Sequence, residues 1–492
     1  NREPQNSFDG PMYDAIKPFL EKADKHIAEQ VYQAILDERI TKNFCEESKL
    51  YEQVERFTDV RTFRRSMQGK DAYEWAWYIL RSMLPNPKDN RLTPLTLDES
   101  TDVNDIFSNP DASSGYLAYP KHKREVPDLI KSVALEIMKS YDKSISFPAI
   151  ALTRAQITDF VDKEGNLSPE TIKYKTRLVM CVDAASVLVE QTFGQPILDL
   201  ILKSQPQYAG GKDDYGVRDF LLRYCSGKRW ISLDYSKFDA TIQGWLIKDV
   251  FKFLSEYYAE EHQTAFEWMT NNFINMQLLM PDGSIKNLHK GIKSGSYFTQ
   301  IVGSLCNIIM ILTYFCFKFG VRKGSKIINV DRVYVELSCN TFPNNPRYLT
   351  IMSMGDDNIF FTRSRIDMKE LSSYLHYNFG AIVTIDGEKG YDEGLSTDKP
   401  HFLKRTWTFN GQYREDLDMF VNLLHPERRR SYKGFSPWHI LFGYYLTFEG
   451  TMRCYFSKLE LLELMEQNGG IDALSEIRLK ELPGSLRSQI MN

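Results

Sequence analysis

The stretch RYLTIMSMGDDNIFFTRS, residues 347–364, places two adjacent aspartates between two apolar runs. Each run favours a β-strand, and the residues Gly-Asp-Asp-Asn between the runs favour a turn. The pattern predicts a hairpin with Asp356 and Asp357 at its turn, where Gly355 lets other groups come close to the backbone. A buried strand pair does not ordinarily present two carboxylates at its turn unless something cationic meets them. We therefore expect a metal site here, with Asp356 pointing at the metal more directly than Asp357.

Another pair of aspartates lies upstream, in RWISLDYSKFDATI, residues 229–242. The apolar residues before Asp234 predict a strand that ends there, and apolar residues at helical spacing from Leu246 to Tyr257 predict a helix behind it. Asp239 is then expected at the start of a helix, where acidic residues often serve only as caps or favour the helix dipole. The combination with the hairpin is more informative, because two rigid elements then present carboxylates that can meet.

Converging carboxylates suit the transfer of a nucleotide from a triphosphate to a 3′-hydroxyl. One divalent ion makes the hydroxyl a better nucleophile, and another holds the triphosphate and the leaving pyrophosphate. Mg²⁺ prefers oxygen ligands and is usually held by one or two carboxylates together with substrate phosphates. We expect two ions, Mg²⁺ or Mn²⁺, at a site that Asp234, Asp356 and Asp357 form.

A loop of small and polar residues precedes a long apolar run, in KSGSYFTQIVGSLCN, residues 293–307. Its small residues would let a nucleic-acid backbone approach, and its polar groups could read a ribose 2′-hydroxyl. The alternative is an ordinary helix start, with Ser294 or Ser296 as the N-cap. The candidate residues of this segment are Ser294, Gly295, Ser296, Thr299 and Asn307.

Cations alternate along KYKTRLVMCVDA, residues 173–184, at Lys173, Lys175 and Arg177. On a β-strand this spacing places all three side chains on one face, where they could bind a triphosphate. The alternative is a solvated edge strand that its charges guard against aggregation.

The composition allows a large core and does not by itself indicate a nucleic-acid binder. Of the 492 residues, 42% are hydrophobic, and the formal net charge is −4. Any electropositive groove must therefore be local. The seven cysteines are scattered without a C-x-x-C pair, which argues against structural zinc and against a disulfide framework.

The apolar run at residues 301–319 is long enough to suggest a membrane-spanning helix. Ser304, Asn307 and Thr313 lie within the run, and Gln300 and Lys318 flank it. We favour a helix buried inside a large domain, because the run directly follows a Gly-Ser loop that needs a rigid support.

Together, and in this order, these segments resemble the motifs of viral RNA-dependent RNA polymerases. KYKTR is similar to the basic fingers motif, and LDYSKFDATI, SGSYFTQIVGSLCN and MGDDN resemble the three palm motifs. FGAIVTIDGEKG resembles the fourth palm motif, and HFLKRTW, residues 401–407, resembles the primer-grip hairpin. SSGYLAYP, residues 113–120, is similar to a motif at the template entrance. The residues of these motifs are most similar to those of the partitivirus and picobirnavirus group, whose genomes are segmented double-stranded RNA.

The resemblance implies an α+β fold, a closed right hand of fingers, palm and thumb with an antiparallel palm sheet backed by helices. A proline-rich connector near residue 90 marks off a mostly helical first part. The expected divisions are an N-terminal extension that bridges fingers and thumb at 1–90, fingers at 91–230, palm at 231–250, a fingers insertion at 251–289, palm again at 290–410, and thumb at 411–492.

The resemblance also implies roles for single residues. The expected catalytic residues are Asp234, Asp356 and Asp357 as metal ligands and Lys389 as the proton donor to pyrophosphate. The expected nucleotide contacts are Lys173, Lys175, Arg177, Asp239, Ser294, Thr299 and Asn307. The expected RNA contacts are Ser113, Ser114, Gly295, Ser296, Lys404 and Arg405. In many positive-strand RNA viruses the motif's Asn stands at the place of Gly303, whereas here Asn307 comes four residues later, as in many double-stranded RNA viruses.

An enzyme of this kind would replicate and transcribe a viral RNA genome. Its partners would be RNA template and product, nucleoside triphosphates and a viral capsid protein, without a membrane, in the virion interior and the host cytoplasm. A reverse transcriptase is one alternative, but its third motif usually has an aromatic residue where Met354 stands here. An inactive RNA-binding protein with a palm fold is another, and the intact set of acidic residues argues against it.

Overall fold

The structure is a computed structural model of the whole chain. It describes residues 5–6, 8–37, 40, 42–43, 46–59, 67–107, 109–141, 146–158, 162, 164, 166–225, 227–337, 350–383, 391–395, 399–426, 430, 432, 436–452 and 454–468.

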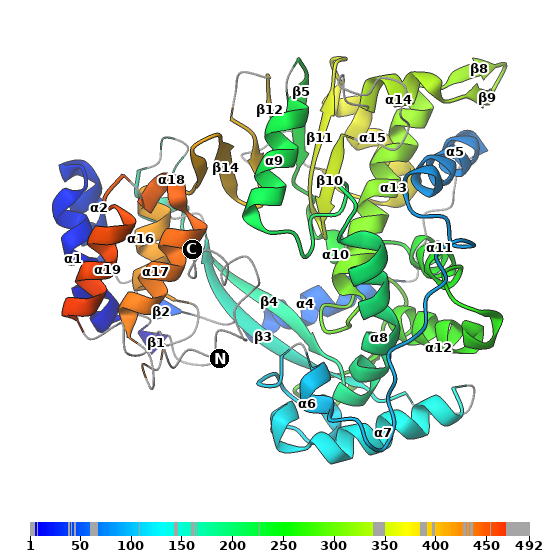
Figure 1. Ribbon diagram of the computed structural model, residues 1–492, viewed down its shortest axis with the longest axis horizontal. Helices are drawn as coiled ribbons and strands as arrows, with labels where there is room; N and C mark the ends of the chain where they lie inside the picture. The colour runs from blue at the N-terminus through cyan, green and yellow to red at the C-terminus, as the bar shows by residue number, and fades with distance from the viewer. Residues whose placement is uncertain are drawn as a thin grey trace.

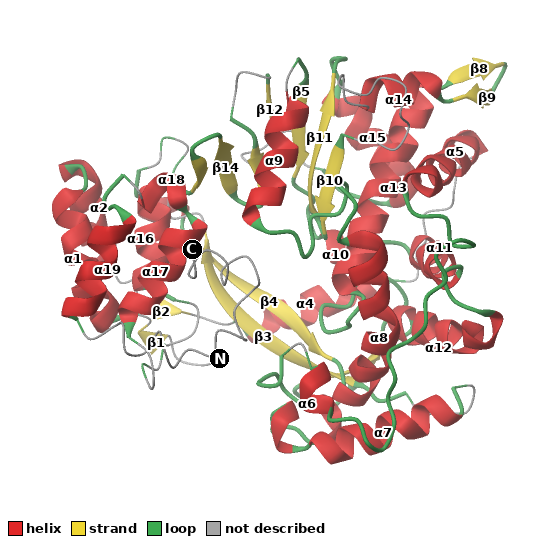
Figure 2. Ribbon diagram, in the orientation of Figure 1, coloured by secondary structure: helices red, strands yellow, loops and turns green. Residues whose placement is uncertain are grey.

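A four-stranded antiparallel sheet forms the centre of the molecule (Figure 2). Its strands run in the order β10 (Ile351–Met354), β11 (Asp357–Thr362), β5 (Arg229–Leu233) and β12 (Tyr391–Gly394). β11 therefore pairs with β10 on one side and with β5 on the other. This order puts the end of β5 beside the start of β11. Segments more than a hundred residues apart in sequence therefore meet at one end of the two central strands.

The long apolar run forms α13 (Thr299–Phe319), which packs on β10. Four more helices surround it: α5 (Met67–Met83), α11 (Gly244–Ser255), α14 (Asp331–Leu337) and α15 (Met368–Phe379). Every residue from Ile301 to Cys316 is buried. By length and composition α13 could cross a membrane, but 89% of its apolar window is buried inside the protein. The interpretation as a buried core helix is confirmed.

A second sheet has the strand order β4 (Lys173–Cys181), β3 (Ala149–Thr158), β6 (Gln277–Leu279) and β7 (Ile285–Asn287). β4 is an edge strand, and α4 (Glu47–Thr58) packs against it. The amide of Gln53 donates to the carbonyl of Thr176 at 2.6 Å and accepts from the N–H of Leu178 at 3.0 Å. A side chain thus provides the edge strand with the hydrogen bonds of a missing neighbour.

Six helices form a separate hydrophobic core, to the left in Figure 1. They are α1 (Gly10–Lys22), α2 (Lys25–Leu36), α16 (Asp416–Leu424), α17 (Pro437–Thr447), α18 (Glu449–Met452) and α19 (Lys458–Gln467). Ile157, near the far end of β3, packs against this core, and the N–H of Leu167 donates to the side chain of Gln30 in α2. The long β3–β4 hairpin therefore connects the second sheet to the C-terminal helices.

The remaining α-helices and strands are α6 (Val103–Ile106), α7 (Pro127–Lys139), α8 (Ala184–Pro196), α9 (Asp214–Cys225), α10 (Phe238–Thr241), α12 (Gln263–Ile274), β1 (Gln5–Asn6), β2 (Lys42–Asn43), β8 (Val321–Lys323), β9 (Lys326–Asn329), β13 (His401–Phe402), β14 (Arg405–Thr408) and β15 (Gly411–Tyr413). β13, β14 and β15 form a three-stranded antiparallel sheet.

Two of the expected domain divisions cut through an element, and a third separates two paired strands. The divisions at residues 230 and 250 fall inside β5 and α11, and the division at 410 falls between the paired strands β14 and β15. The first 90 residues contact the C-terminal helices through α1 and α2, the second sheet through α4, and the central helix through α5. The assignment of these parts to fingers, palm and thumb stays a prediction.

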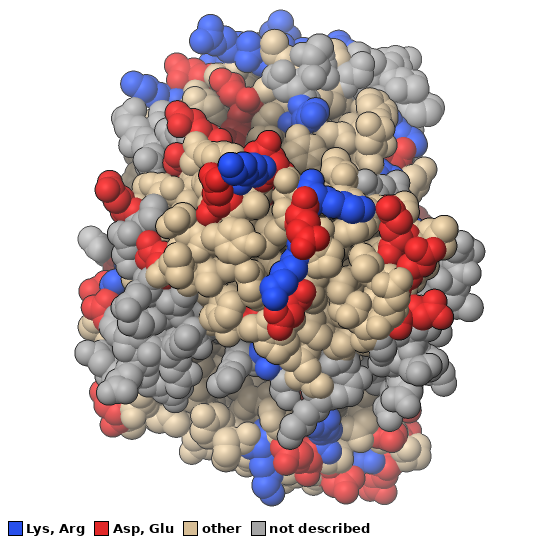
Figure 3. All heavy atoms as spheres, turned by 90° about the vertical axis from the view of Figure 1, so that its left-hand side faces the viewer, with Lys and Arg blue, Asp and Glu red and all other residues tan. Residues whose placement is uncertain are grey.

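The face on the side of α1 and α2 carries mixed charges. Figure 3 shows Lys and Arg interspersed with Asp and Glu between broad neutral areas. A strong field of one sign is therefore not present on the described part of this face, in keeping with the small net charge of −4.

Truncating a side chain of the central helix should destabilise the protein. Ile309 in α13 is fully buried, so Ile309→Ala is expected to cost about 2–5 kcal/mol of unfolding free energy through lost burial and a cavity. Denaturation by urea measures the change. Leu459→Ala in α19 is the control, because Leu459 is 67% exposed and its truncation should change stability by about 0.5 kcal/mol or less. Equal effects of the two substitutions would contradict the burial of α13.

Candidate active site

The hairpin turn is shorter than its sequence suggests. Asp357 is already paired with Met354, so only Gly355 and Asp356 lie between the strands. Gly355 has a φ of 64°, as the first residue of a two-residue hairpin turn often does. The prediction that Asp357 and Asn358 belong to the turn is wrong, because strand pairing continues through both residues.

The structure brings the predicted carboxylates together. Asp234 directly follows β5, and Asp357 begins the neighbouring strand β11. The charges of Asp234 and Asp356 both act on Asp357, and the charge of Asp356 also acts on Asp239 at the start of α10. Acidic side chains from three segments of the chain thus share one region of space.

Burial and repulsion change the acidity of Asp357. Its removal from water raises the pKa of this carboxyl to about 6, and the negative charges of Asp356 and Asp234 add to the rise. Lys404 opposes the shift and lowers the pKa. Ionising Asp357 therefore costs more than ionising an ordinary aspartate, and a cation nearby would offset that cost.

Asp239 shows the same effect more strongly. Solvent reaches its side chain, yet the protein around it excludes much of the surrounding water, and this desolvation raises its pKa to about 7. The charge of Asp356 raises the pKa further, whereas Arg177 and Lys293 lower it. Asp239 therefore lies between the acidic hairpin on one side and two cations on the other.

These carboxylates fit divalent metal ions in ligand type and in charge. They are hard oxygen donors, and their mutual repulsion is relieved when a cation binds between them. Among the described residues, no group of three or more His, Cys, Asp or Glu side chains is already close enough to hold one ion. Mg²⁺ often takes only one or two protein carboxylates and completes its shell with substrate phosphates and water. The arrangement therefore suits an ion that binds together with its substrate.

The two expected RNA contacts of the primer-grip segment differ in their surroundings. Lys404 lies between β13 and β14 with a φ of 56°, is exposed, and acts on Asp357. Arg405 forms an ion pair with Asp214 of α9, at 2.6 Å between Nη1 and Oδ1, and its guanidinium lies over the ring of Phe448. Lys404 is thus close to the carboxylates, whereas the charge of Arg405 is largely used within the protein.

One cation of the basic strand acts on the carboxylates. Lys173, Lys175 and Arg177 alternate along β4, as their spacing predicts. The alternative interpretation is correct that β4 is an edge strand, but α4 covers that edge, so charge is not needed to guard it. Arg177 acts on Asp239, which places its cation near the acidic hairpin.

The small residues of the loop before α13 pack against the protein itself. The hydroxyl of Ser294 accepts from the N–H of Met180 at 3.0 Å, and a Cβ on Gly295 would lie 2.0 Å from the carbonyl oxygen of Met180. The hydroxyl of Ser296 donates to Glu190 in α8 at 2.8 Å. The smallness of Gly295 therefore allows the close approach of β4, and its expected contact with RNA stays a prediction.

The residues at the start of α13 also bond within the loop. The hydroxyl of Thr299 donates to the carbonyls of Lys293 and Ser296. The N-cap of α13 is Phe298, so the alternative of a serine N-cap is wrong, although Ser296 still accepts from the N–H of Phe298 at 3.1 Å.

Asn307 is not available to a ribose in this structure. Its side chain is fully buried, and its amide nitrogen donates to the carbonyls of Gly355 at 3.0 Å and Asp356 at 2.9 Å. Its amide oxygen accepts from the hydroxyl of Tyr235 at 3.2 Å. Both ends of its amide are thus used inside the protein, and the expected contact of Asn307 with the ribose stays a prediction.

Sequence reasoning missed two residues near the carboxylates, Ser304 and Lys293. The hydroxyl of Ser304 accepts from the N–H of Gly355 at 2.8 Å. Lys293 is fully buried and donates to the carbonyls of Lys290, Gly291 and Ile274, at 2.6, 3.0 and 3.3 Å. Burial lowers the pKa of Lys293 to about 7, and Asp239 opposes this. Three carbonyl acceptors match the three donors of an ammonium, so we favour the charged form.

The expected template-entrance residues hold a loop in place. The hydroxyl of Ser114, which is buried, donates to the carbonyl of Lys121 at 2.9 Å, and the hydroxyl of Ser113 accepts from the N–H of Gly115 at 3.2 Å. The carbonyl of Ser114 also accepts from the N–H of Ala184, which ties the loop to the start of α8. Lys389, the expected proton donor, lies outside the described residues.

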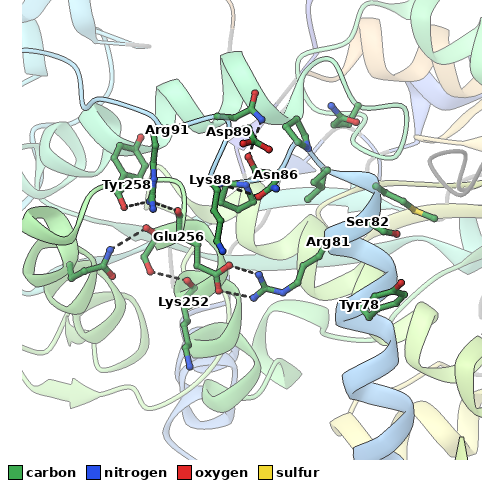
Figure 4. A pocket seen from close by; sticks show the side chains of 18 of the residues that line it. Tyr78, Arg81, Ser82, Asn86, Lys88, Asp89, Arg91, Lys252, Glu256 and Tyr258 are labelled. Atoms are coloured by element: carbon green, nitrogen blue, oxygen red, sulfur yellow. Dashed lines mark hydrogen bonds and ion pairs between the residues drawn. The ribbon is translucent and has the colours of Figure 1, made fainter. Parts of the chain in front are cut away.

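A cavity of about 1310 Å³ lies apart from the carboxylates, between α5, the proline-rich connector and α11 (Figure 4). Arg81 points toward Glu256 and forms an ion pair with it, and Arg91 donates to the carbonyls of Glu256 and Tyr258 at 2.7 Å each. None of the predicted site residues lines this cavity. Arg81 thus connects α5 to the end of α11, and Arg91 connects the proline-rich connector to it, so both arginines have a structural role.

Comparison with known proteins gives a family match over most of the central region. The model of the family described as "Viral RNA-dependent RNA polymerase" matches residues 93–421, which is more than half of the chain. The match includes every segment whose motif is described above.

Two curated relatives match over shorter stretches. The RNA-directed RNA polymerase of Cryptosporidium parvum virus 1 is 34% identical over 96 residues, which are 18% of this chain and 18% of that protein. The non-structural polyprotein 1AB of ovine astrovirus 1 is 30% identical over 86 residues, 16% of this chain and 6% of the polyprotein. The matched part therefore spans less than a fifth of either relative.

A solved structure resembles the whole arrangement. The crystal structure of the RNA-dependent RNA polymerase of a human picobirnavirus superposes with a TM-score of 0.58 and 13% sequence identity, covering 90% of this chain and 77% of that one. At this identity the likeness concerns the fold, and it confirms the expected α+β right hand.

Replacing Asp357 should stabilise the metal-free protein at high pH. Folding raises the pKa of this carboxyl from an ordinary value of about 3.9 to about 6, so its ionisation opposes folding progressively between those values and fully above them. Asp357→Asn should therefore raise the thermal unfolding midpoint in EDTA at pH 8, and the gain should shrink as the pH falls from 6 toward 4.

If Asp357 is a metal ligand as expected, the same variant should also lose stabilisation that Mg²⁺ confers on the wild type at pH 8. A lower midpoint of Asp357→Asn in EDTA at pH 8 would contradict the repulsion that the site geometry indicates.

Proposed function

Because the chain belongs to the family of viral RNA-dependent RNA polymerases, we propose that it copies an RNA template by joining ribonucleotides to an RNA 3′-hydroxyl. The observation that carries the proposal is the meeting of Asp234, Asp356 and Asp357 at the edge of an antiparallel sheet. The relatives are matched over only part of their length, so the activity of the whole protein rests on this site and on the family.

In the proposed reaction, the oxygen of the 3′-hydroxyl bonds to the α-phosphate of a nucleoside triphosphate, and the bond between the α- and β-phosphates breaks. When bound, two divalent ions would activate the hydroxyl and hold the triphosphate and the leaving pyrophosphate. Asp234, Asp356 and Asp357 would hold these ions, with Mg²⁺ or Mn²⁺ as the candidates. Lys389 remains our candidate for the group that protonates the pyrophosphate.

The cations near Asp239 suit the rest of the nucleotide. Arg177 and Lys175 project from β4, and the former acts on Asp239 beside the hairpin. We assign the triphosphate to the basic strand, because a row of cations favours phosphate oxygens. We assign the ribose to Asp239, whose carboxylate can accept a hydrogen bond from a 2′-hydroxyl.

The two alternatives, a reverse transcriptase and an inactive RNA-binding protein, can each be distinguished from an RNA-dependent RNA polymerase. A reverse transcriptase shares the palm but would prefer deoxyribonucleotides on an RNA template. An inactive RNA-binding protein would not need several carboxylates in a desolvated position, where each raises the cost of ionising the next. That electrostatic cost supports an enzyme whose site is completed by cations.

We extend the proposal to the surroundings of the enzyme, namely a viral capsid protein as partner, the virion interior and host cytoplasm as location, and no dependence on a membrane. The extension is motivated by the similarity of the sequence motifs to those of the partitivirus and picobirnavirus group. Cosedimentation of the polymerase with capsid particles from the same virus tests the partner. Recovery of the polymerase with membranes instead would overturn it.

Removing a metal ligand should abolish synthesis without unfolding the protein. Asp356→Asn and Asp234→Ala are each expected to lower ribonucleotide incorporation on single-stranded RNA by about a hundredfold or more, because each removes charge that holds the ions. The assay is primer-free incorporation with and without metal, and it is repeated with deoxyribonucleotides.

The control for these variants is Asp392→Asn on β12, an exposed aspartate of the same sheet that should leave incorporation unchanged. RNA binding by all three variants should persist and should weaken with salt, because phosphate contacts release counterions. Near-normal synthesis by Asp356→Asn would remove the metal assignment, and preferential DNA synthesis by the wild type would favour a reverse transcriptase.

Loss of Asp239 should affect substrate choice. Asp239→Ala is expected to lower the preference for ribonucleotides over deoxyribonucleotides by about tenfold or more, because one hydrogen bond from the 2′-hydroxyl to a charged acceptor is lost. A competition assay with both nucleotide types on one template measures the ratio. An unchanged ratio would count against the assignment of the ribose to this residue.

A further inference from the structure

The Gly355–Asp356 turn is held from one side by the buried helix α13. The helix presents Gly303, Ser304 and Asn307 to the turn. A Cβ on Gly303 would lie 3.5 Å from the Cα of Gly355, so helix and turn are in close contact. Ser304 receives the N–H of Gly355 at 2.8 Å, and Asn307 binds both carbonyls of the turn, at 3.0 and 2.9 Å.

The turn is also connected to the strand that precedes Asp234. The amide nitrogen of Asn358 lies 3.3 Å from the carbonyls of both Leu233 and Asp356, and its oxygen accepts from the N–H of Leu233 at 3.2 Å. The carbonyl of Asp356 therefore receives hydrogen bonds from Asn307 and from Asn358. These bonds link the backbones beside Asp234 and Asp356 through amides that are themselves fully buried.

The polar side-chain atoms of Ser304 and Asn307 are all buried and hydrogen-bonded within the protein, so they are not available to a nucleotide. Asn307 and Ser304 are both 0% exposed. The nitrogen of Asn307 has two acceptors and its oxygen accepts from Tyr235, while the hydroxyl of Ser304 accepts from Gly355 and donates to the carbonyl of Gln300. A buried amide with both ends satisfied orients its neighbours, and it cannot exchange partners without leaving a polar group unpaired.

We propose that Ser304 and Asn307 are positioning residues that hold the Gly355–Asp356 turn in the geometry that binds metal, and that neither residue contacts the nucleotide. The proposal rests on the proposed function for its metal ions. In this proposal, Asn307 does not recognise the ribose, and residues outside α13 do so.

A fixed turn is needed because the carboxylates repel one another. The charge of Asp356 acts on both Asp357 and Asp239. A turn of two residues that begins with glycine could swing the carboxylate of Asp356 away toward solvent and lower this repulsion. Hydrogen bonds from a buried helix to three backbone groups of the turn oppose that movement, so the carboxylates stay where cations can meet them.

The test compares Ser304→Ala and Asn307→Leu with Thr313→Val in the full-length protein. Thr313 is a matched control, because it lies in the same buried helix and its hydroxyl also donates to a carbonyl four residues earlier, at 2.6 Å, but it does not contact the turn. Mn²⁺ binding is followed by electron paramagnetic resonance without nucleotide or RNA. Ribonucleotide incorporation and the ratio of ribo- to deoxyribonucleotide use are measured in parallel.

We expect Ser304→Ala and Asn307→Leu each to lower the Mn²⁺ affinity and kcat by about 10–100-fold, as is usual when a group that orients a metal ligand is removed. The KM for nucleotide and the ribonucleotide preference should be unchanged, and high Mn²⁺ should restore part of the activity. Thr313→Val should match the wild type in Mn²⁺ affinity.

A relaxed ribonucleotide preference of Asn307→Leu with normal Mn²⁺ affinity would overturn the proposal, because Asn307 would then contact the nucleotide. An equal loss of Mn²⁺ affinity in Thr313→Val would also overturn it, since any polar deletion in α13 would then have the same effect. If Asn307→Leu does not fold, the smaller change Ser304→Ala gives the same readout. A wild type that binds Mn²⁺ but synthesises no RNA would count against the proposed function and leave the positioning role measurable.

Discussion

The mutual repulsion of aspartates that are held close together is the constraint on which the rest of the structure depends. Asp234, Asp356 and Asp357 lie in one region, with Asp239 next to Asp356, and desolvation adds to the cost of ionising two of them. An arrangement of this kind is unfavourable in the absence of cations, so it persists only because the backbone that carries it is strongly supported. The supports are the pairing of β11 with β5 and the contacts of α13 with the turn.

The burial of α13 follows from this need. A helix that packs on β10 and contacts four other helices cannot shift without disturbing the main hydrophobic core. Its polar residues Ser304 and Asn307 therefore hold the turn in one position. The cost of burying these two side chains is offset by their hydrogen bonds. The same apolar composition that makes α13 resemble a membrane helix makes it a rigid base for the carboxylates.

The cations around the carboxylates come from segments that are distant in sequence. Arg177 belongs to β4, Lys293 lies in the loop before α13, and Lys404 lies between β13 and β14. Each lowers the pKa of an aspartate of the site. They offset only part of the repulsion, since the pKa values of Asp357 and Asp239 remain about 6 and about 7. The protein alone thus leaves the site short of positive charge, which is the condition that favours the binding of metal ions.

The sequence by itself determined the hairpin, the strand before Asp234, the buried helix and the family, because these depend on local patterns of apolar residues and on motifs in a particular order. It did not determine the partners of polar side chains. Asn307 bonds to a carbonyl 48 residues away, and Gly295 approaches the backbone of Met180, so both have structural roles that their motif did not suggest. Only the tertiary structure decided these roles, because a hydrogen bond or a close backbone approach depends on which segments the fold brings within about 3 Å of one another.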